Sequence, residues 1–198
     1  MIGRFRFILS MVIKKAIGLL RLKGAERQAK RAAGSFSYTA QPRINVPIRC
    51  DGAGRVYLSE EVNLGYRRAP MLGNGEVLLQ ARTPESLISI GSKTTTSNNI
   101  SIVSCSRVKI GNSCQIGDLV SIYDCDFHEI NPETRNQSPG ISLPVVIGNN
   151  VWLGSRVMVL KGVKIGDHSV VAAGSVVTSS IPERSLVAGV PAKIIRKI

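Results

Sequence analysis

The stretch IGNNVWLGSRVMVLKGVKIGDHSVVAAGSVVT, residues 147–178, decides the fold, because an aliphatic residue returns in it at every sixth position. The six positions are Ile147, Leu153, Val159, Ile165, Val171 and Val177. Small or branched residues follow four positions later at Val151, Val157, Val163, Ser169 and Ser175. A half-buried strand repeats every two residues and a helix about every 3.6, so neither accounts for a period of six. The stretch therefore predicts short strands stacked turn upon turn, with columns of aliphatic side chains pointing inward.

The same repeat extends toward the N-terminus. It appears in two further registers, Ile110, Ile116, Ile122 and Ile90, Thr96, Ile102. The tetrapeptides ISIG (88–91), VKIG (108–111), VVIG (145–148) and VKIG (163–166) mark the same point of successive turns. The last two are eighteen residues apart, which corresponds to three six-residue segments per turn. We expect an all-β core over residues 88–198, preceded by irregular first coils over residues 35–87.

The chain of 198 residues is long enough for one substantial core. Its four cysteines, Cys50, Cys105, Cys114 and Cys125, are irregularly spaced and form no CxxC pair. We interpret them as reduced thiols of a cytoplasmic protein, and we expect no metal site. A zinc enzyme of the γ-carbonic anhydrase type needs three histidine ligands, whereas this sequence contains two histidines.

Residues 1–34 carry nine cations against the single anion Glu26. The apolar residues of this segment share one helical face: Phe5, Leu9, Val12, Ile13, Ala16, Leu19 and Leu20. The longest uncharged apolar run, residues 7–13, is too short to cross a bilayer. Two interpretations stay open for residues 1–23: a helix on an anionic membrane surface, or a helix packed on its own domain or a neighbouring subunit. Residues 24–34, the end of the basic amphipathic helical segment 1–34, are expected to be a polar extension or a linker, and no nucleic-acid partner is expected.

The repeat is interrupted once, by the loop at residues 123–144. This segment is long, polar and rich in turn formers, and it contains His128. A regular stack of strands does not need such an insertion, and long loops on rigid scaffolds often carry function. The loop is therefore the first place to look for chemistry.

From about Ile88 to Ile198 the chain resembles the hexapeptide-repeat acyltransferases, whose fold is a left-handed parallel β-helix. The DxDFH form of the histidine loop, followed by IGNNVWLG (147–154), resembles the galactoside, capsule and O-antigen sugar O-acetyltransferases. VAAGSVVT (171–178) and the ending VAGVPAKIIRKI (187–198) also resemble segments of that family. The resemblance implies transfer of an acetyl group from acetyl-CoA to a sugar hydroxyl in surface-polysaccharide biosynthesis. It further implies a homotrimer with acetyl-CoA bound between adjacent prisms.

The resemblance also implies roles for individual residues. His128 is the expected general base, and Trp152 a wall beside the acceptor or the pantetheine arm. Asp124 and Asp126 are expected either to orient the imidazole or bind sugar hydroxyls, or simply to form turns. Further expected acceptor contacts are Asn98, Asn99 and Arg135. The expected acetyl-CoA contacts are Gly154, Ser155, Ala173, Thr178, Val190, Pro191 and Lys193.

A histidine suits this chemistry because a sugar hydroxyl is a weak nucleophile at neutral pH. A neutral imidazole can accept the hydroxyl proton during attack, an effect typically worth about 10²–10⁴-fold in rate. Two alternatives stay open: N-acetylation of a nucleotide-linked amino sugar, and a non-enzymatic scaffold tethered to the membrane. In each case we expect a cytoplasmic protein, peripheral on the inner face of the cytoplasmic membrane.

Overall fold

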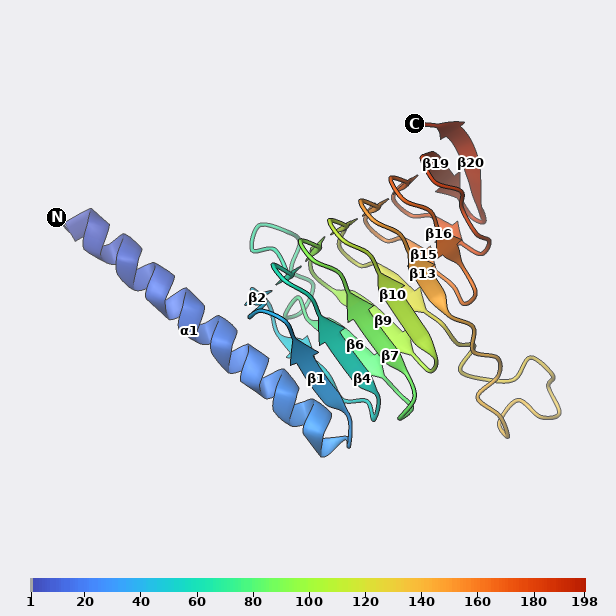
Figure 1. Ribbon diagram of the computed structural model, residues 1–198, viewed down its shortest axis with the longest axis horizontal. Coiled ribbons are helices and arrows are strands. Elements are labelled where there is room, and N and C mark those ends of the chain that lie inside the picture. Colours follow the sequence, from blue (N-terminus) through green and yellow to red (C-terminus); the bar gives the residue numbers. More distant parts are fainter. Residues whose placement is uncertain (1) are drawn as a thin grey trace.

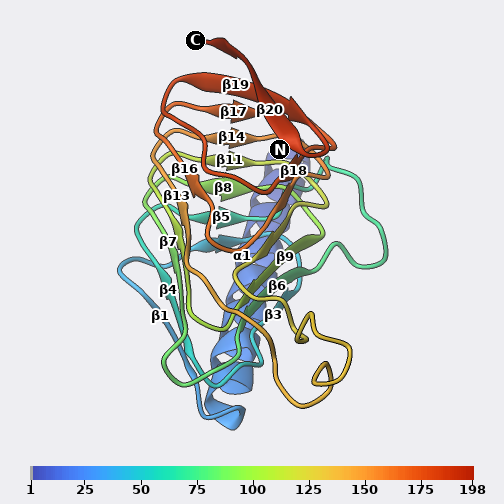
Figure 2. The same ribbon diagram turned by 90° about the vertical axis from the view of Figure 1, so that its right-hand side faces the viewer.

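The computed structural model describes residues 2–198, apart from the side chains of residues 2–8 and Ser10. Three sheets form the walls of a triangular prism (Figures 1 and 2). Sheet A pairs its strands in the order β1 (Ser35–Tyr38), β4 (Arg55–Leu58), β7 (Leu87–Ile90), β10 (Arg107–Ile110), β13 (Val145–Ile147) and β16 (Lys164–Ile165).

Sheet B pairs β2 (Arg43–Ile44), β5 (Asn63–Leu64), β8 (Thr95–Thr96), β11 (Gln115–Ile116), β14 (Trp152–Leu153), β17 (Val170–Val171), β19 (Ser185–Gly189) and β20 (Ala192–Lys197). Sheet C pairs β3 (Ile48–Arg49), β6 (Val77–Ala81), β9 (Ile100–Ser104), β12 (Ser121–Tyr123), β15 (Met158–Val159) and β18 (Val176–Val177). The chain visits sheets A, B and C in turn before it starts the next coil. All pairings between these strands are parallel except that of β19 with β20, an antiparallel hairpin at the C-terminal end.

The six-residue repeat places its aliphatic side chains in the core, as the sequence predicts. Ile110 pairs with Ile90 on one side and Ile147 on the other, so one residue type continues through neighbouring turns of sheet A. All six aliphatic residues of the deciding stretch, from Ile147 to Val177, are at most 1% exposed. Full burial of such side chains contributes about 1.5–3 kcal/mol each, which makes these columns the main stabilising feature of the prism.

The corners of the prism follow the same period. Residues with positive φ recur six apart at Asn150, Arg156, Gly162, His168 and Gly174. Each lies between two short strands, where the backbone must turn from one sheet to the next. The left-handed region favours glycine and asparagine, which explains the polar and glycine-rich positions between the aliphatic ones.

Two loops interrupt the corners (Figure 2). The first loop, residues 65–76, joins β5 to β6 at the corner between sheets B and C. The second loop, residues 124–144, joins β12 to β13 at the corner between sheets C and A. Because a prism corner faces away from the opposite wall, the second loop projects from the side opposite to sheet B.

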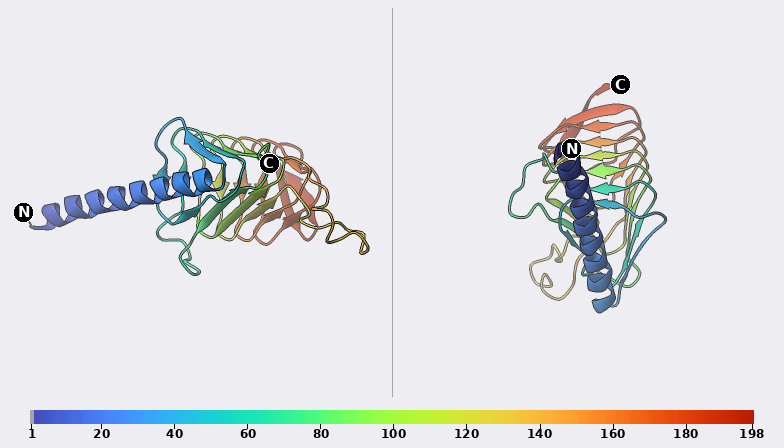
Figure 3. Two further views of the ribbon diagram at one scale, coloured as in Figure 1. Left: turned by 90° about the horizontal axis from the view of Figure 1, so that it is seen from below. Right: turned by 90° about the vertical axis from the view of Figure 1, so that its left-hand side faces the viewer.

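The helix α1 (Ile2–Arg31) packs its C-terminal half against the first coil, while its N-terminal half extends past the prism (Figures 1 and 3). Leu22, Ala25 and Ala29 are buried there. Of the two alternatives for residues 24–34, the linker is wrong: the helix continues to Arg31, because two small alanines on one face let it lie close to the coil. Within residues 2–198, no helix is long and apolar enough to cross a membrane. The division of the chain at residues 34 and 87 stays a prediction.

Candidate active site

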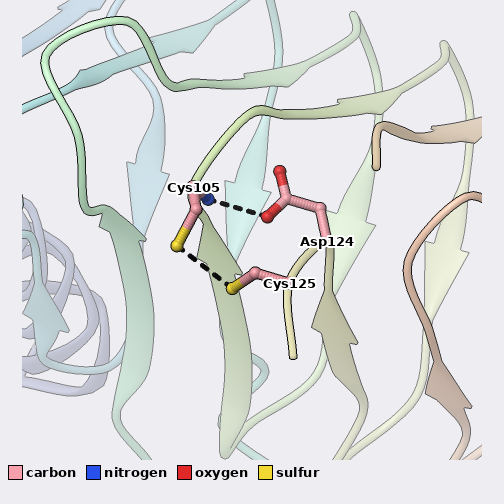
Figure 4. Close-up of side chains that lie close together, drawn as sticks. All are labelled: Cys105, Asp124 and Cys125. Carbon is pink, nitrogen blue, oxygen red and sulfur yellow. Dashed lines mark hydrogen bonds between the residues drawn. The ribbon is translucent and has the colours of Figure 1, made fainter. Parts of the chain in front are cut away.

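The second loop is rooted by Asp124, which is fully buried. Its carboxylate accepts hydrogen bonds from the Ser104 hydroxyl (2.7 Å) and from the backbone N–H groups of Cys105 (2.7 Å) and Ser106 (3.0 Å). Cys105, whose backbone N–H donates to Asp124, lies directly beside the root of the loop (Figure 4), and Ser104 and Ser106 are its neighbours in the chain. Both carboxylate oxygens are thus occupied, which favours the turn-forming alternative for Asp124 over a contact with substrate.

The sulfur atoms of Cys105 and Cys125 lie 3.1 Å apart in the same place. Burial, together with the neighbouring Cys105 thiol, raises the pKa of Cys125 well above the ordinary thiol range. The Cys105, Asp124 and Cys125 ligand atoms lie within 4.8 Å of one another, the arrangement that a metal ion would need. A metal would have to compete with the three donors on Asp124 and deprotonate a buried thiol, so the cluster is better explained as the packing of the loop root.

Beyond the root, a short antiparallel ladder closes the second loop. The N–H of Leu143 donates to Asp124 O (2.8 Å) and that of Asp126 to Ile141 O (3.2 Å). Phe127 then adopts a positive φ of 70° and packs its ring edge-on against Tyr123, with the Arg82 guanidinium 4.6 Å from the ring centre. The next residue, His128, is exposed to solvent. The contacts of Phe127 with Tyr123 and Arg82 therefore fix the backbone immediately before His128, the candidate base. The His128 imidazole itself stays accessible to solvent.

Asp126 forms an ion pair with Lys161, and both side chains are largely buried. Its other carboxylate oxygen, Oδ2, is buried and has no hydrogen-bond partner within the described part of the chain. A side chain at Gly140 would collide with the backbone oxygen of His128 and with Cβ of Asp126, so Gly140 lets the two arms of the loop approach closely. No hydrogen bond joins Asp126 to the His128 imidazole in the described structure, so the expected role of Asp126 in orienting the ring stays a prediction.

The expected acceptor contacts Asn98 and Asn99 lie elsewhere. Asn98 is fully buried, accepts a hydrogen bond from Tyr66 N (2.8 Å), and donates to the backbone oxygens of Tyr66 (3.0 Å) and Pro70 (3.3 Å). Asn99 donates to the same Pro70 oxygen at 3.2 Å. Both amides hold the first loop, and the complete engagement of Asn98 argues against a role in binding substrate. Arg135 lies exposed in the second loop and donates to Ile130 O (3.1 Å).

Trp152 lies on strand β14 of sheet B and is 55% exposed. It pairs in register with Gln115 of β11 and Val170 of β17. Sheet B is the wall opposite to the corner that carries the second loop (Figure 2). Within one chain, therefore, the prism body stands between Trp152 and the root of the His128 loop.

The expected acetyl-CoA contacts fall into two groups. Gly154, Ser155 and Ala173 form an edge at the corner between sheets B and C, where Gly154 stacks so closely on Ala173 that a side chain would collide with its backbone nitrogen. The Ser155 hydroxyl donates to Asp118, and the Ser155 backbone oxygen accepts a hydrogen bond from Gly174 N–H (2.9 Å). Thr178 follows β18 at the end of sheet C, and Val190, Pro191 and Lys193 lie exposed at the β19–β20 hairpin. An accessible edge of small residues with cations near its end fits a long anionic thioester.

Three features of this region were not expected from the sequence: the Lys161–Asp126 ion pair, the Arg82–Phe127 contact and the Cys105–Cys125 contact. A signal existed for the cysteines. Each follows an inward residue, Ile102 or Ile122, by three positions, and these two isoleucines pair in register. The partners of Lys161 and Arg82 depend on the path of the loop, which has no repeat.

Comparison with known proteins agrees with this description. Residues 144–179 match the family described as bacterial transferase hexapeptide (six repeats). The galactoside O-acetyltransferase of Escherichia coli (strain K12) is 43% identical over 100 residues, which cover 50% of this chain and 49% of the relative. WbbJ of the same strain, whose name places it in lipopolysaccharide biosynthesis as an O-acetyl transferase, is 43% identical over 106 residues, 50% of this chain and 54% of the relative. The chain spans about half the length of the curated relatives it matches.

Solved structures similar to this chain are acetyltransferases as well. A hexapeptide-repeat acetyltransferase from Vibrio cholerae, complexed with acetyl-CoA, is 36% identical with a TM-score of 0.54 over 56% of this chain and 60% of that one. A galactoside acetyltransferase in complex with coenzyme A is 34% identical with a TM-score of 0.54 over 69% of this chain and 64% of that one. The predicted fold class, a left-handed parallel β-helix preceded by a helix, is confirmed. By its repeat, its architecture and these relatives, the chain is similar to the hexapeptide-repeat transferases, and residues 144–179 carry the match to that family.

Proposed function

We propose that the protein is an O-acetyltransferase that moves the acetyl group of acetyl-CoA to a sugar hydroxyl, with His128 as the general base. The observation that carries the proposal is the placement of His128 on the long loop of an otherwise regular prism. His128 is exposed and directly follows Phe127, which packs against Tyr123 and Arg82. The names of the relatives support the chemistry: one acts on galactosides, and solved relatives hold acetyl-CoA or coenzyme A.

In the proposed reaction, the His128 imidazole accepts the proton of the sugar hydroxyl while that oxygen attacks the thioester carbonyl. Collapse of the tetrahedral intermediate breaks the carbon–sulfur bond, and the imidazolium returns its proton to the leaving sulfur. The products are the O-acetyl sugar and free coenzyme A thiol, and the histidine ends neutral. Acid–base help of this kind is typically worth about 10²–10⁴-fold. Asp126, through its unpaired buried oxygen, is the proposed positioning residue for the ring.

The proposed site lies between copies of the chain. His128 stands at the corner opposite to sheet B, whereas Trp152 stands on sheet B, so a site that uses both requires a second copy. A closed ring of three prisms would place each second loop against the neighbour's sheet B. In this homotrimer, acetyl-CoA would lie along Trp152, Gly154, Ser155 and Ala173.

The proposed acceptor is a sugar of a surface polysaccharide, such as capsule, O-antigen or exopolysaccharide, or its lipid-linked precursor. The similarity to WbbJ supports this choice. The proposed location is the cytoplasm, at the inner face of the cytoplasmic membrane.

The first experiment follows thiol release from acetyl-CoA with a panel of sugars and sugar polymers. We expect His128→Ala to lower turnover by about 100-fold or more while coenzyme A still binds. His168→Ala is the matched control, because His168 is exposed at a corner between sheets A and B and its imidazole forms a hydrogen bond with Asn150 alone in the described structure. Equal turnover in wild type and His128→Ala would remove His128 from the mechanism and favour an amino acceptor.

A second experiment tests the shared site. His128→Ala and Trp152→Ala chains are expressed separately and together, and turnover is measured per chain. If each site combines residues from two copies, mixed assemblies contain some sites with both residues intact and recover activity that neither variant has alone. No recovery in mixed assemblies would contradict the proposed placement of the site.

A further inference from the structure

A cleft of about 710 Å³ lies between α1 and the first coil, far from the second loop. It is lined by Met11, Lys14, Lys15, Gly18, Leu19, Gln41, Pro42, Arg43, Ile44, Asn45 and Arg67. Four of these residues are cations and none is acidic. They come from the helix, from β2 and from the first loop, so the folded structure gathers charges that are dispersed in the sequence.

The positive charge of this cleft is not neutralised by the protein. The first acidic residue of the chain is Glu26, and its carboxylate accepts a hydrogen bond from Tyr38 instead. The ion pairs found in the described part of the chain involve Arg49 and Lys161, not the cleft cations. Beside the cleft, Arg21 donates to Asn45 O, and burial and the nearby charge of Arg67 lower its pKa. Like charges held together in this way favour binding of an anion.

The two faces of α1 differ in what they contact. One face packs on the coil through Gly18, Leu22, Ala25 and Ala29, spaced by three and four residues. Lys14, Lys15 and Met11 continue that inner face into the cleft. The opposite face carries Leu9, Val12, Ile13, Ala16 and Leu20. These side chains are exposed, and Leu20 is the most exposed of them at 70%. The apolar stripe therefore points away from the domain to which the helix belongs.

This arrangement separates the two open interpretations of the N-terminal segment. The inner face of the helix packs on its own domain, as one interpretation requires, but the apolar stripe has no partner in the part of the chain that the structure describes. An interfacial helix places its apolar face at the acyl boundary and its cations at the level of the lipid phosphates. Nucleic acid would match the cations but not the apolar stripe, and a second copy would cover the stripe but carry the same positive charge.

We propose that the cleft between α1 and the first coil binds the phosphate group of an anionic membrane lipid, while the outer stripe of α1 rests at the acyl boundary. Lys14 and Lys15 approach the phosphate from the helix, and Arg43 and Arg67 approach it from the prism. The site is distinct from the proposed acetyl-transfer site and does not rest on that function. It would hold the prism at the membrane surface by its N-terminal end.

The test is co-sedimentation of the full chain with vesicles of phosphatidylcholine alone, or with a third of the lipid replaced by phosphatidylglycerol. We expect binding to the anionic vesicles only. Arg43→Gln with Arg67→Gln should weaken it roughly 30-fold, since each juxtamembrane cation is worth about fivefold. Val12→Asn with Ile13→Asn should also weaken it. Arg107→Gln with Lys109→Gln, two exposed cations on β10, is the matched control and should change binding by less than the cleft pair.

Several results would overturn the proposal. Equal binding to both vesicle types, or equal loss in the cleft pair and the β10 pair, would mean that the cleft does not bind the phosphate group of an anionic lipid. Displacement from vesicles by inorganic phosphate would assign the cleft to a free anion, and displacement by duplex DNA to nucleic acid. A smaller assembly in light scattering for Val12→Asn with Ile13→Asn would make the stripe an interface between copies. Thiol release from acetyl-CoA, measured without vesicles, distinguishes all these outcomes from failure of the proposed enzyme.

Discussion

The two loops of the prism are both anchored by a buried polar side chain, but they are held to different extents. The first loop is bound along its length: Asn98, from the next coil, reaches Tyr66 and Pro70, and Gly65 N–H donates to the Thr96 hydroxyl at 3.1 Å. The second loop is bound at its root by Asp124 and its ladder, and then at Phe127. Residues 128–140 extend beyond these contacts and are mostly exposed.

This difference separates a structural loop from a loop suited to reach another molecule. Backbone oxygens of the first loop accept hydrogen bonds from side chains of its own prism, as Tyr66 O does from Asn98. Arg67 of this loop lines the cleft beside the helix. The second loop keeps a fixed root and a free outer part, which is the arrangement expected of a loop that completes a site between copies.

The largest expected effect is at the root of the second loop. Asp124→Ala leaves two backbone N–H groups and the Ser104 hydroxyl without their acceptor in a buried corner. We expect the free energy of unfolding in urea to fall by about 3 kcal/mol or more. Asp124→Asn keeps one acceptor oxygen and should lose less. If both substitutions left stability unchanged, Asp124 would not be the anchor of this loop.

The corresponding substitution at the first loop is Asn98→Ala. It removes one acceptor and two donors that face backbone groups, so we expect a loss of about 2 kcal/mol. Trypsin should then cut faster after Arg67 and Arg68, which limited proteolysis with mass spectrometry will detect. Asn99→Gly is the control, because Asn99 has a φ of 57° that glycine adopts freely and its side chain contributes a single hydrogen bond to the loop. An equal effect of both variants would contradict the central role of Asn98.

The unequal anchoring also predicts the order of cleavage in the wild-type protein. Arg135 is the one trypsin site inside the second loop, and Arg67 and Arg68 are those of the first. We expect cleavage after Arg135 to be about tenfold faster, because opening beyond the root breaks fewer contacts. The measurement is the time course of the two sets of peptides. Earlier cleavage after Arg68 would reverse the comparison between the loops.

The repeat made most of the prism predictable from the sequence. Ile147, Leu153 and Val159 could be assigned to the core because each aliphatic column is a local, periodic signal. The position of the second loop was predictable for the same reason, since it is the place where the period stops. A helical segment could be predicted within residues 1–34, but the sequence left open whether residues 24–34 extend the helix or form a linker, because Ala25 and Ala29 are small and carry little periodic signal.

The side-chain roles were less predictable. The sequence predicts a substrate contact for Asn98 and leaves substrate contact or turn formation open for Asp124, since buried anchors and substrate ligands use the same polar residue types. What distinguishes them is the set of backbone groups that the fold brings to each side chain, and these lie 28 to 32 residues away for Asn98. The roles of His128 and Trp152 stay predictions, because they depend on a second copy and on ligands.

The smallest expected effect is a pH dependence confined to the second loop. The anchor of the first loop, Asn98, does not titrate, whereas the root of the second contains Cys125. Burial and the adjacent Cys105 raise the pKa of the Cys125 thiol, so the native state favours the protonated form. The stability contributed by this thiol is complete below its ordinary pKa, near 9.0, and is lost as the pH rises above that value. Between about pH 8 and about pH 10, subtilisin should therefore cut residues 128–140 a few-fold faster relative to residues 67–74. Cys125→Ala should abolish the change in this ratio, and a ratio that still changes in that variant would assign the titration to another group.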